Sequence, residues 1–143
     1  MNLKKLTITQ LVNLKKSVSL EIYNRREEKV KLLEAERKYK EYVLLYAKGL
    51  TSFVSKELGY NVIHTSRKNK YTFARFVLAN HLRHTMNMAW IPMGHVFNSK
   101  HHSSMMHCVS TYKNLVSTGD TEFCIIKDRV ESLIKQYDAK QNK

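Results

Sequence analysis

The sequence has very few of the residues that interrupt helices. Among its 143 residues there are one proline and four glycines, whereas proteins rich in strands and tight turns need both types repeatedly. From about Thr9 to Lys48 neither type occurs. We therefore predict an all-α protein.

Cysteine is also scarce, and long apolar runs are missing. The two cysteines, Cys108 and Cys124, lie in segments that we predict to be helical, so we expect both to be reduced and buried rather than part of a disulfide framework. No run reaches the roughly 18 apolar residues of a membrane span. The basic residues from Met1 to Lys5 are followed by polar ones, which does not fit a secretion signal. We expect a cytoplasmic protein that does not contact a membrane.

Acidic residues are absent from the middle of the chain. The whole sequence has 25 Lys and Arg against 12 Asp and Glu, a formal net charge of +13. Residues 61–115 contain seven basic residues, all seven histidines and no carboxylate. Such a segment suits a surface that faces the phosphates of a nucleic acid, because a carboxylate there would repel the ligand. A solvated basic surface and attraction to anionic lipid are the simpler alternatives.

The first third of the sequence has the apolar spacing of a long helix. Apolar residues recur three and four positions apart between residues 9 and 48. The repeat falters at Arg25 and Lys29, so we predict a long helix rather than a regular coiled coil, packed against a protein partner, a second copy or its own domain. Gly49 is expected to end or kink this helix. We therefore divide the chain into a helical extension, residues 1–48, and a compact domain, residues 49–143.

The second part of the sequence predicts a small helical domain. A polar, basic loop is expected over residues 61–70. Pro92 suits the first turn of a short helix, and Asp120 or Thr121 suits the N-cap of the last one. After a short segment at 50–58, the expected helices cover residues 71–84, 92–97 and 101–115, followed by a last helix from residue 120 or 121.

The segment around residue 100 has the pattern of a helix-turn-helix. A short helix, a turn at Asn98-Ser99 and a second helix would present a cluster of hydrogen-bond donors at the start of that helix, namely Lys100, His101, His102, Ser103 and Ser104. In DNA-binding helix-turn-helix proteins the second helix enters the major groove by this end. Its inward face would be formed by Met105, Cys108, Val109 and Tyr112, and its outward face would include His107 and Lys113.

Residues 93–108 resemble the C-terminal DNA-binding domain of the bacterial replication initiator DnaA. That family carries the signature Ile-Gly-x-x-Phe-Gly-Gly-Arg-Asp-His-Thr-Thr-Val-x-His-Ala, and this sequence aligns with it without a gap. The identical positions are Gly94, Phe97, His102 and His107, and the conservative replacements are Lys100, Ser103 and Ser104. Arg67 and Arg75 repeat the eight-residue spacing of two arginines in the family's basic loop and following helix. The resemblance covers roughly residues 50–137.

The resemblance implies a function and a set of DNA contacts. It implies a helix-turn-helix of the DnaA or Trp-repressor kind that binds double-stranded DNA. The residues from Lys100 to Ser104, together with His107, would lie in the major groove. Arg67 would enter the adjacent minor groove, where a narrow A·T-rich groove concentrates negative potential. Lys68, Lys70 and Arg75 would support contacts to the DNA backbone.

The sequence also departs from the family. His101 replaces an aspartate, and Asn98-Ser99 replaces a glycine pair, although Asn tolerates a left-handed conformation. The preferred DNA sequence therefore need not be that of the initiator. The chain lacks the Gly-x-x-x-x-Gly-Lys-[Ser/Thr] loop of an ATPase, so we expect no bound nucleotide. We expect a stand-alone, nucleoid-associated DNA-binding protein of a bacterium or phage that regulates replication or transcription.

Three alternatives compete with this interpretation. His101, His102, His107 and Cys108 contain metal-ligating groups, but adjacent histidines on one helix do not readily face one ion. Ser103 or Ser104 beside His102 would need a carboxylate to orient the imidazole, and the sequence has none between residues 58 and 119. We therefore expect no metal, no cofactor and no enzymatic activity. The third alternative is a structural protein that assembles through its first helix and binds nucleic acid without sequence preference.

Overall fold

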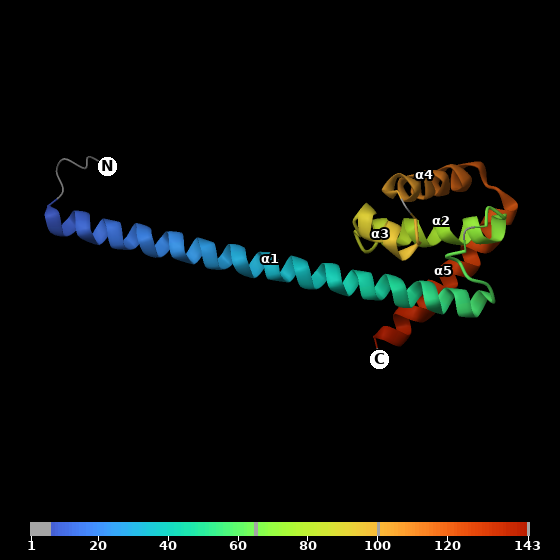
Figure 1. The fold of residues 1–143 in the computed structure, drawn as a ribbon, viewed down its shortest axis with the longest axis horizontal. Coiled ribbons are helices and arrows are strands. Elements are labelled where there is room, and N and C mark those ends of the chain that lie inside the picture. The colour runs from blue at the N-terminus through green and yellow to red at the C-terminus, as the bar shows by residue number, and fades with distance from the viewer. Residues whose placement is uncertain (1–6, 65, 100, 143) are drawn as a thin grey trace. The chain divides into compact units, whose positions relative to one another are not determined.

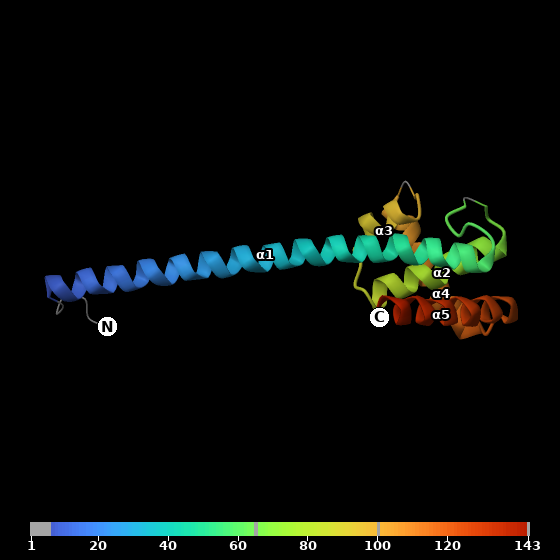
Figure 2. The ribbon, with the colours of Figure 1, turned by 90° about the horizontal axis from the view of Figure 1, so that it is seen from below.

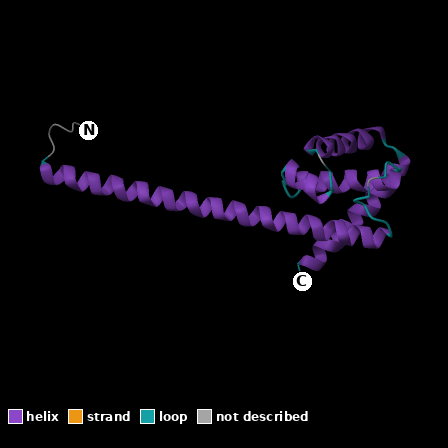
Figure 3. Cartoon of the chain, viewed as in Figure 1, coloured by secondary structure: helices purple, strands orange, loops and turns teal. Residues whose placement is uncertain are grey.

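The computed structural model describes residues 7–64, 66–99 and 101–142, and in this part of the chain it is entirely α-helical, without a strand (Figure 3). This confirms the predicted fold class, including the long N-terminal helix. The five helices are α1 (Ile8–Leu58), α2 (Asn69–His84), α3 (Trp90–Val96), α4 (His102–Thr118) and α5 (Thr121–Gln141).

Helix α1 is longer than the sequence predicts. Gly49 neither ends nor kinks it, and the helix continues to Leu58. A Cβ atom built at Gly49 would overlap the hydroxyl group of Tyr137 on α5, so the glycine permits a close contact between two helices. The cost of glycine within a helix, about 1 kcal/mol relative to alanine, is offset by this packing. Our expectation for Gly49 was therefore wrong.

The chain divides into two compact units, residues 1–39 and residues 40–143. The sequence placed this division at residue 48. The structure places it earlier because Val43, Tyr46 and Ala47 are already buried in the core of the second unit.

The first unit contains the N-terminal part of α1. Thr7 and Gln10 form a capping box: the Thr7 hydroxyl accepts a hydrogen bond from the Gln10 amide at 3.3 Å, and the Gln10 side chain accepts one from the Thr7 amide at 2.9 Å. Arg25 and Glu21, one turn apart, form an ion pair at 2.6 Å. Most of its large apolar side chains are exposed, from Ile8 at 82% to Leu11 at 42%. This helix therefore leaves most of its apolar surface uncovered.

The second unit is built around α2. This helix packs against α4 and α5, and α3 packs against α4 (Figures 1 and 2). The C-terminal part of α1 adds buried side chains to the same core. The largest fully buried residues include Phe123, Leu50, Leu78, Leu82, Met93 and Leu133.

The predicted helix boundaries in this unit are close to those observed. Pro92 lies in the first turn of α3. Asp120 is the N-cap of α5, where its carboxylate accepts a hydrogen bond from the Phe123 amide at 2.8 Å. Asn98 adopts the expected left-handed conformation, with φ of 55°. The predictions from turn and capping chemistry are confirmed at these three residues.

Two further expectations concern cysteine and the membrane. Cys108 is buried, as expected, but Cys124 is only half-buried, and both are free thiols. Cys124 follows the buried Phe123 in the first turn of α5, and consecutive residues of a helix point in different directions. Among the helices of the described ranges, none has both the length and the apolar character needed to cross a membrane.

Candidate nucleic-acid interface

The turn between α3 and α4 presents its polar side chains outward. It is closed by two backbone hydrogen bonds, from the Ser99 amide to the Gly94 carbonyl at 2.8 Å and from the Asn98 amide to the His95 carbonyl at 3.3 Å. His101 is the N-cap of α4, and none of its side-chain atoms caps the helix. The side chains of His101, His102, Ser103 and Ser104 are all exposed. Lys100, the remaining member of the predicted cluster, lies outside the described residues.

The orientation of α4 follows from its apolar spacing. Met105, Cys108 and Val109 are buried, with 3%, 8% and 5% of their surface exposed, and burial raises the pKa of the Cys108 thiol. His107 and Lys113 are exposed, as predicted. The His107 ring lies 3.3 Å from the Thr111 hydroxyl one turn later.

The outward face of α4 extends beyond the residues that the sequence singled out. Met106, Ser110 and Asn114 are also exposed, and they lie three, seven and eleven positions after Ser103. Helical spacing from Ser103 would have identified them, because residues three, four and seven apart share one face.

A cleft of about 670 Å³ brings together residues from three parts of the sequence. Arg67 lines it from the basic loop, Arg75 from α2, and Ser103, Ser104 and His107 from α4. Its apolar lining is formed by Ile63, Phe76, Phe97, Met105 and Cys108. No Asp or Glu occurs among the described residues that line this cleft, so its charged side chains are cationic.

Two of the five N–H donors of Arg75 are engaged within the protein. One guanidinium nitrogen, Nη1, donates to the His64 carbonyl, and Nη2 donates to the Ser66 carbonyl at 2.8 Å. Partial burial lowers the pKa of Arg75 from its usual range. The predicted role in DNA backbone contacts would have to use the remaining donors or compete with these two hydrogen bonds.

The other two predicted basic residues lie at the start of α2. Lys68 is the N-cap residue of that helix and is exposed. The ammonium group of Lys70 lies 5.1 Å from the ring centre of Tyr60 and 4.9 Å from that of Tyr71, which is a cation–π geometry. This aromatic cluster was not predictable from the sequence, because Tyr60 and Tyr71 lie at opposite ends of the loop.

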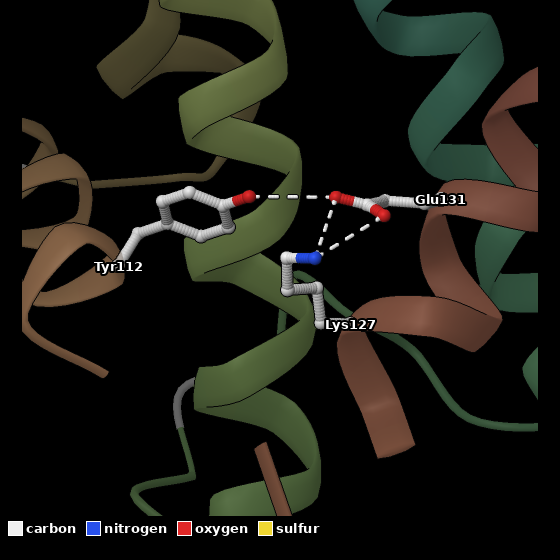
Figure 4. Close-up of polar contacts among 3 residues, drawn as sticks. All are labelled: Tyr112, Lys127 and Glu131. Atoms are coloured by element: carbon white, nitrogen blue, oxygen red, sulfur yellow. Dashed lines mark hydrogen bonds and ion pairs between the residues drawn. The ribbon is translucent and has the colours of Figure 1, made fainter. Parts of the chain in front are cut away.

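The position of α4 relative to α5 is fixed by polar and aromatic contacts. The Tyr112 hydroxyl of α4 donates to Glu131 of α5 at 3.4 Å, and the same carboxylate binds Lys127 at 3.3 Å (Figure 4). The Tyr112 ring also packs edge-on against Phe123, with ring centres 5.7 Å apart. These contacts hold α4 by its inward side and leave its outward face accessible.

A carboxylate of α5 contacts the start of α2, next to the basic loop. The Glu122 side chain accepts a hydrogen bond from the Asn69 side chain at 3.2 Å. This contact concerns the first residue of α2 and not the lining of the cleft. Within the described ranges, no three His, Cys, Asp or Glu side chains are grouped so that they could hold a metal ion.

Comparison with known proteins finds no relative of this chain. No protein-family model, no curated protein and no solved structure matches this chain.

Proposed function

We propose that this protein binds double-stranded DNA, with the first turn of α4 in the major groove and Arg67 in the adjacent minor groove. The observation that carries the proposal is the cleft: exposed donors of α4 and the exposed Arg67 of the basic loop line it together. In this proposal the protein is not an enzyme, and it needs neither a nucleotide nor a metal.

The geometry of duplex DNA suits such a cleft. The major groove is about 12 Å wide and admits a helix, and the minor groove on the other side of each strand is narrower. A protein that contacts both grooves must straddle the sugar-phosphate backbone between them. The cleft between Arg67 and Ser103 would receive that backbone, and its lining has cationic but no acidic side chains among the described residues.

The outward residues of α4 offer the chemistry of base recognition. Ser103, Ser104 and His107 provide hydroxyl and imidazole groups that donate or accept hydrogen bonds, and Met106 can contact a thymine methyl group. The resemblance of residues 93–108 to the DnaA signature supports this assignment. On the same basis we propose that the protein acts on the nucleoid of a bacterial or phage-infected cell, where it regulates replication or transcription.

Selection from a random duplex pool, followed by competition, tests the proposal. A selected site should outcompete a random duplex of the same length by well over tenfold, on the order of the ratio between specific and nonspecific DNA affinity. If six or more cations meet phosphates, affinity should fall roughly a thousandfold between 50 and 200 mM salt. Equal competition by random and selected duplexes would contradict sequence recognition.

A second candidate function rests on the uncovered helix of the first unit. Large apolar side chains such as Leu20, Leu32 and Leu33 are 61%, 66% and 56% exposed. We propose that the exposed side chains of residues 9–48 contact a protein partner or a second copy of the chain, with the basic surface holding nucleic acid without sequence preference. Sedimentation of the full chain distinguishes self-association, since a concentration-dependent dimer would favour a second copy. In this alternative the competition experiment gives no preferred site.

A further inference from the structure

The loop that carries Arg67 is held in place by side chains of its neighbours. In the first contact, the Arg75 guanidinium donates hydrogen bonds to the carbonyls of both His64 and Ser66. In the second contact, the Tyr60 hydroxyl donates to the Lys70 carbonyl at 3.0 Å. The His64 ring stacks on Tyr71, with ring centres 4.9 Å apart, and its Nδ1 accepts a hydrogen bond from the Ser66 amide at 3.0 Å.

Of these contacts, the one from Arg75 lies closest to Arg67. The Ser66 carbonyl that it binds belongs to the residue immediately before Arg67. A planar guanidinium has several N–H donors in a fixed fork and can hold two carbonyls at once, whereas a lysine ammonium is a point charge on a flexible stem. The direction of the Arg67 backbone is therefore set in part by the α2 side chain.

We propose that Arg75 is a positioning residue: it fixes the basic loop so that Arg67 is preorganised for the minor groove, and it does not itself bind a phosphate. Two tests follow. The first does not involve DNA, whereas the second rests on the proposed DNA-binding function. Preorganisation matters because a loop that is ordered only on binding loses affinity to the entropy of ordering.

The first test needs no DNA. Trypsin can cleave after Arg67, Lys68 and Lys70, all of which are exposed. Arg75→Gln and Arg75→Lys should both be cleaved in this loop at least several-fold faster than the wild type, in native buffer well below their melting temperatures. Lys113→Gln, which removes an exposed cation from α4, is the matched control and should be cleaved in the loop at the wild-type rate. Wild-type cleavage rates in both Arg75 variants would overturn the proposal.

The second test uses Arg75→Lys, which keeps the positive charge but cannot form the two-carbonyl bridge. If Arg75 positions Arg67, this variant should lose the preference for A·T pairs beside the main site to the same extent as Arg67→Ala, by about fivefold or more. The double variant Arg67→Ala/Arg75→Lys should then be no worse than Arg67→Ala alone. A uniform loss of affinity with the A·T preference intact, or losses that multiply in the double variant, would identify Arg75 as a phosphate ligand and overturn the proposal.

The two tests separate the two ways of failing. If the wild-type protein shows no A·T preference at all, the proposed minor-groove contact fails, and the proteolysis result still decides whether Arg75 orders the loop. If the wild type shows the preference and Arg75→Lys retains it, the DNA-binding proposal stands and the positioning role is rejected.

Discussion

Gly49 of α1 faces the hydroxyl of Tyr137 on α5 with no space for a methyl group between them. The Tyr137 ring is held there by aromatic neighbours on α1, since its centre lies 5.5 Å from those of both Tyr46 and Phe53. This contact joins the C-terminal part of α1 to the last helix of the chain. It accounts for a glycine in the interior of a helix that otherwise contains none.

Substitution of Gly49 tests this contact. Gly49→Ala should lower the free energy of unfolding by about 1 kcal/mol, because a steric overlap of about 1–3 kcal/mol exceeds the gain in helix propensity of about 1 kcal/mol. Urea denaturation measures the change. Tyr137→Phe removes the atom that the new methyl group would meet, so it should restore part of the loss in the double variant. Ser52→Ala, on an exposed position of the same helix, should not destabilise the protein.

The N-cap of α5 gives a second prediction. Asp120→Ala removes the carboxylate that accepts the Phe123 amide hydrogen bond, and should lower the free energy of unfolding by about 1 kcal/mol. Thermal or urea unfolding measures this loss. Asp128→Ala removes an equal charge from an exposed position within the same helix and should have a clearly smaller effect. Similar losses in both variants would show that the cap is unimportant.

The pH dependence of stability is predicted to involve His81. Its Nε2 lies 2.9 Å from the hydroxyl oxygen of Tyr46, and that hydroxyl donates its one proton to Asp138 at 2.6 Å. Burial lowers the pKa of His81, and the Asp138 carboxylate only partly opposes this effect. In the unfolded chain a histidine has a pKa of about 6.5. Residue 81 therefore binds a proton more readily in the unfolded chain than in the folded protein. Stability should fall as the pH drops from about 7 through 6.5 towards the lower pKa of the folded state.

Urea denaturation at pH 7.5 and 5.5 measures this effect. In His81→Gln the decrease in the free energy of unfolding should be smaller than in the wild type, because the titrating group is gone. His84→Gln, which changes an exposed histidine in the same helix, should keep the wild-type decrease. If all three proteins lose equal stability, His81 does not carry the pH dependence.

The role of Arg67 is tested by comparing two exposed cations. Arg67→Ala should cost about 1–3 kcal/mol of binding free energy and relax the preference for A·T pairs beside the main site. Lys113→Ala removes an exposed cation from α4 that does not line the cleft, and should cost less and leave the preference unchanged. Fluorescence anisotropy with matched duplexes measures both. Small and equal effects would contradict insertion of Arg67 into a groove.

The helices, and which side chains of the candidate interface face inward or outward, were predictable from local patterns. Apolar spacing placed Met105, Cys108 and Val109 inside, and turn chemistry identified Asp120 and Asn98. Contacts between distant parts of the chain were not predictable in this way. The need for a glycine at residue 49 comes from Tyr137, and the interactions of Lys70 depend on Tyr60 and Tyr71. The cleft itself forms only when the loop, α2 and α4 are packed together, so its apolar lining could not be inferred from one sequence.

The most direct test of the proposed DNA-binding surface is the change in backbone amide NMR signals when a selected duplex is added to the full chain. The proposed DNA-binding mode predicts the largest shifts at the first turn of α4, from His101 to Ser104, at His107, and in the loop at Arg67 and Lys68. Residues of the first unit between Ile8 and Tyr39, and the exposed face of α5, should change little. Shifts concentrated in either of those regions, with the start of α4 unaffected, would contradict it.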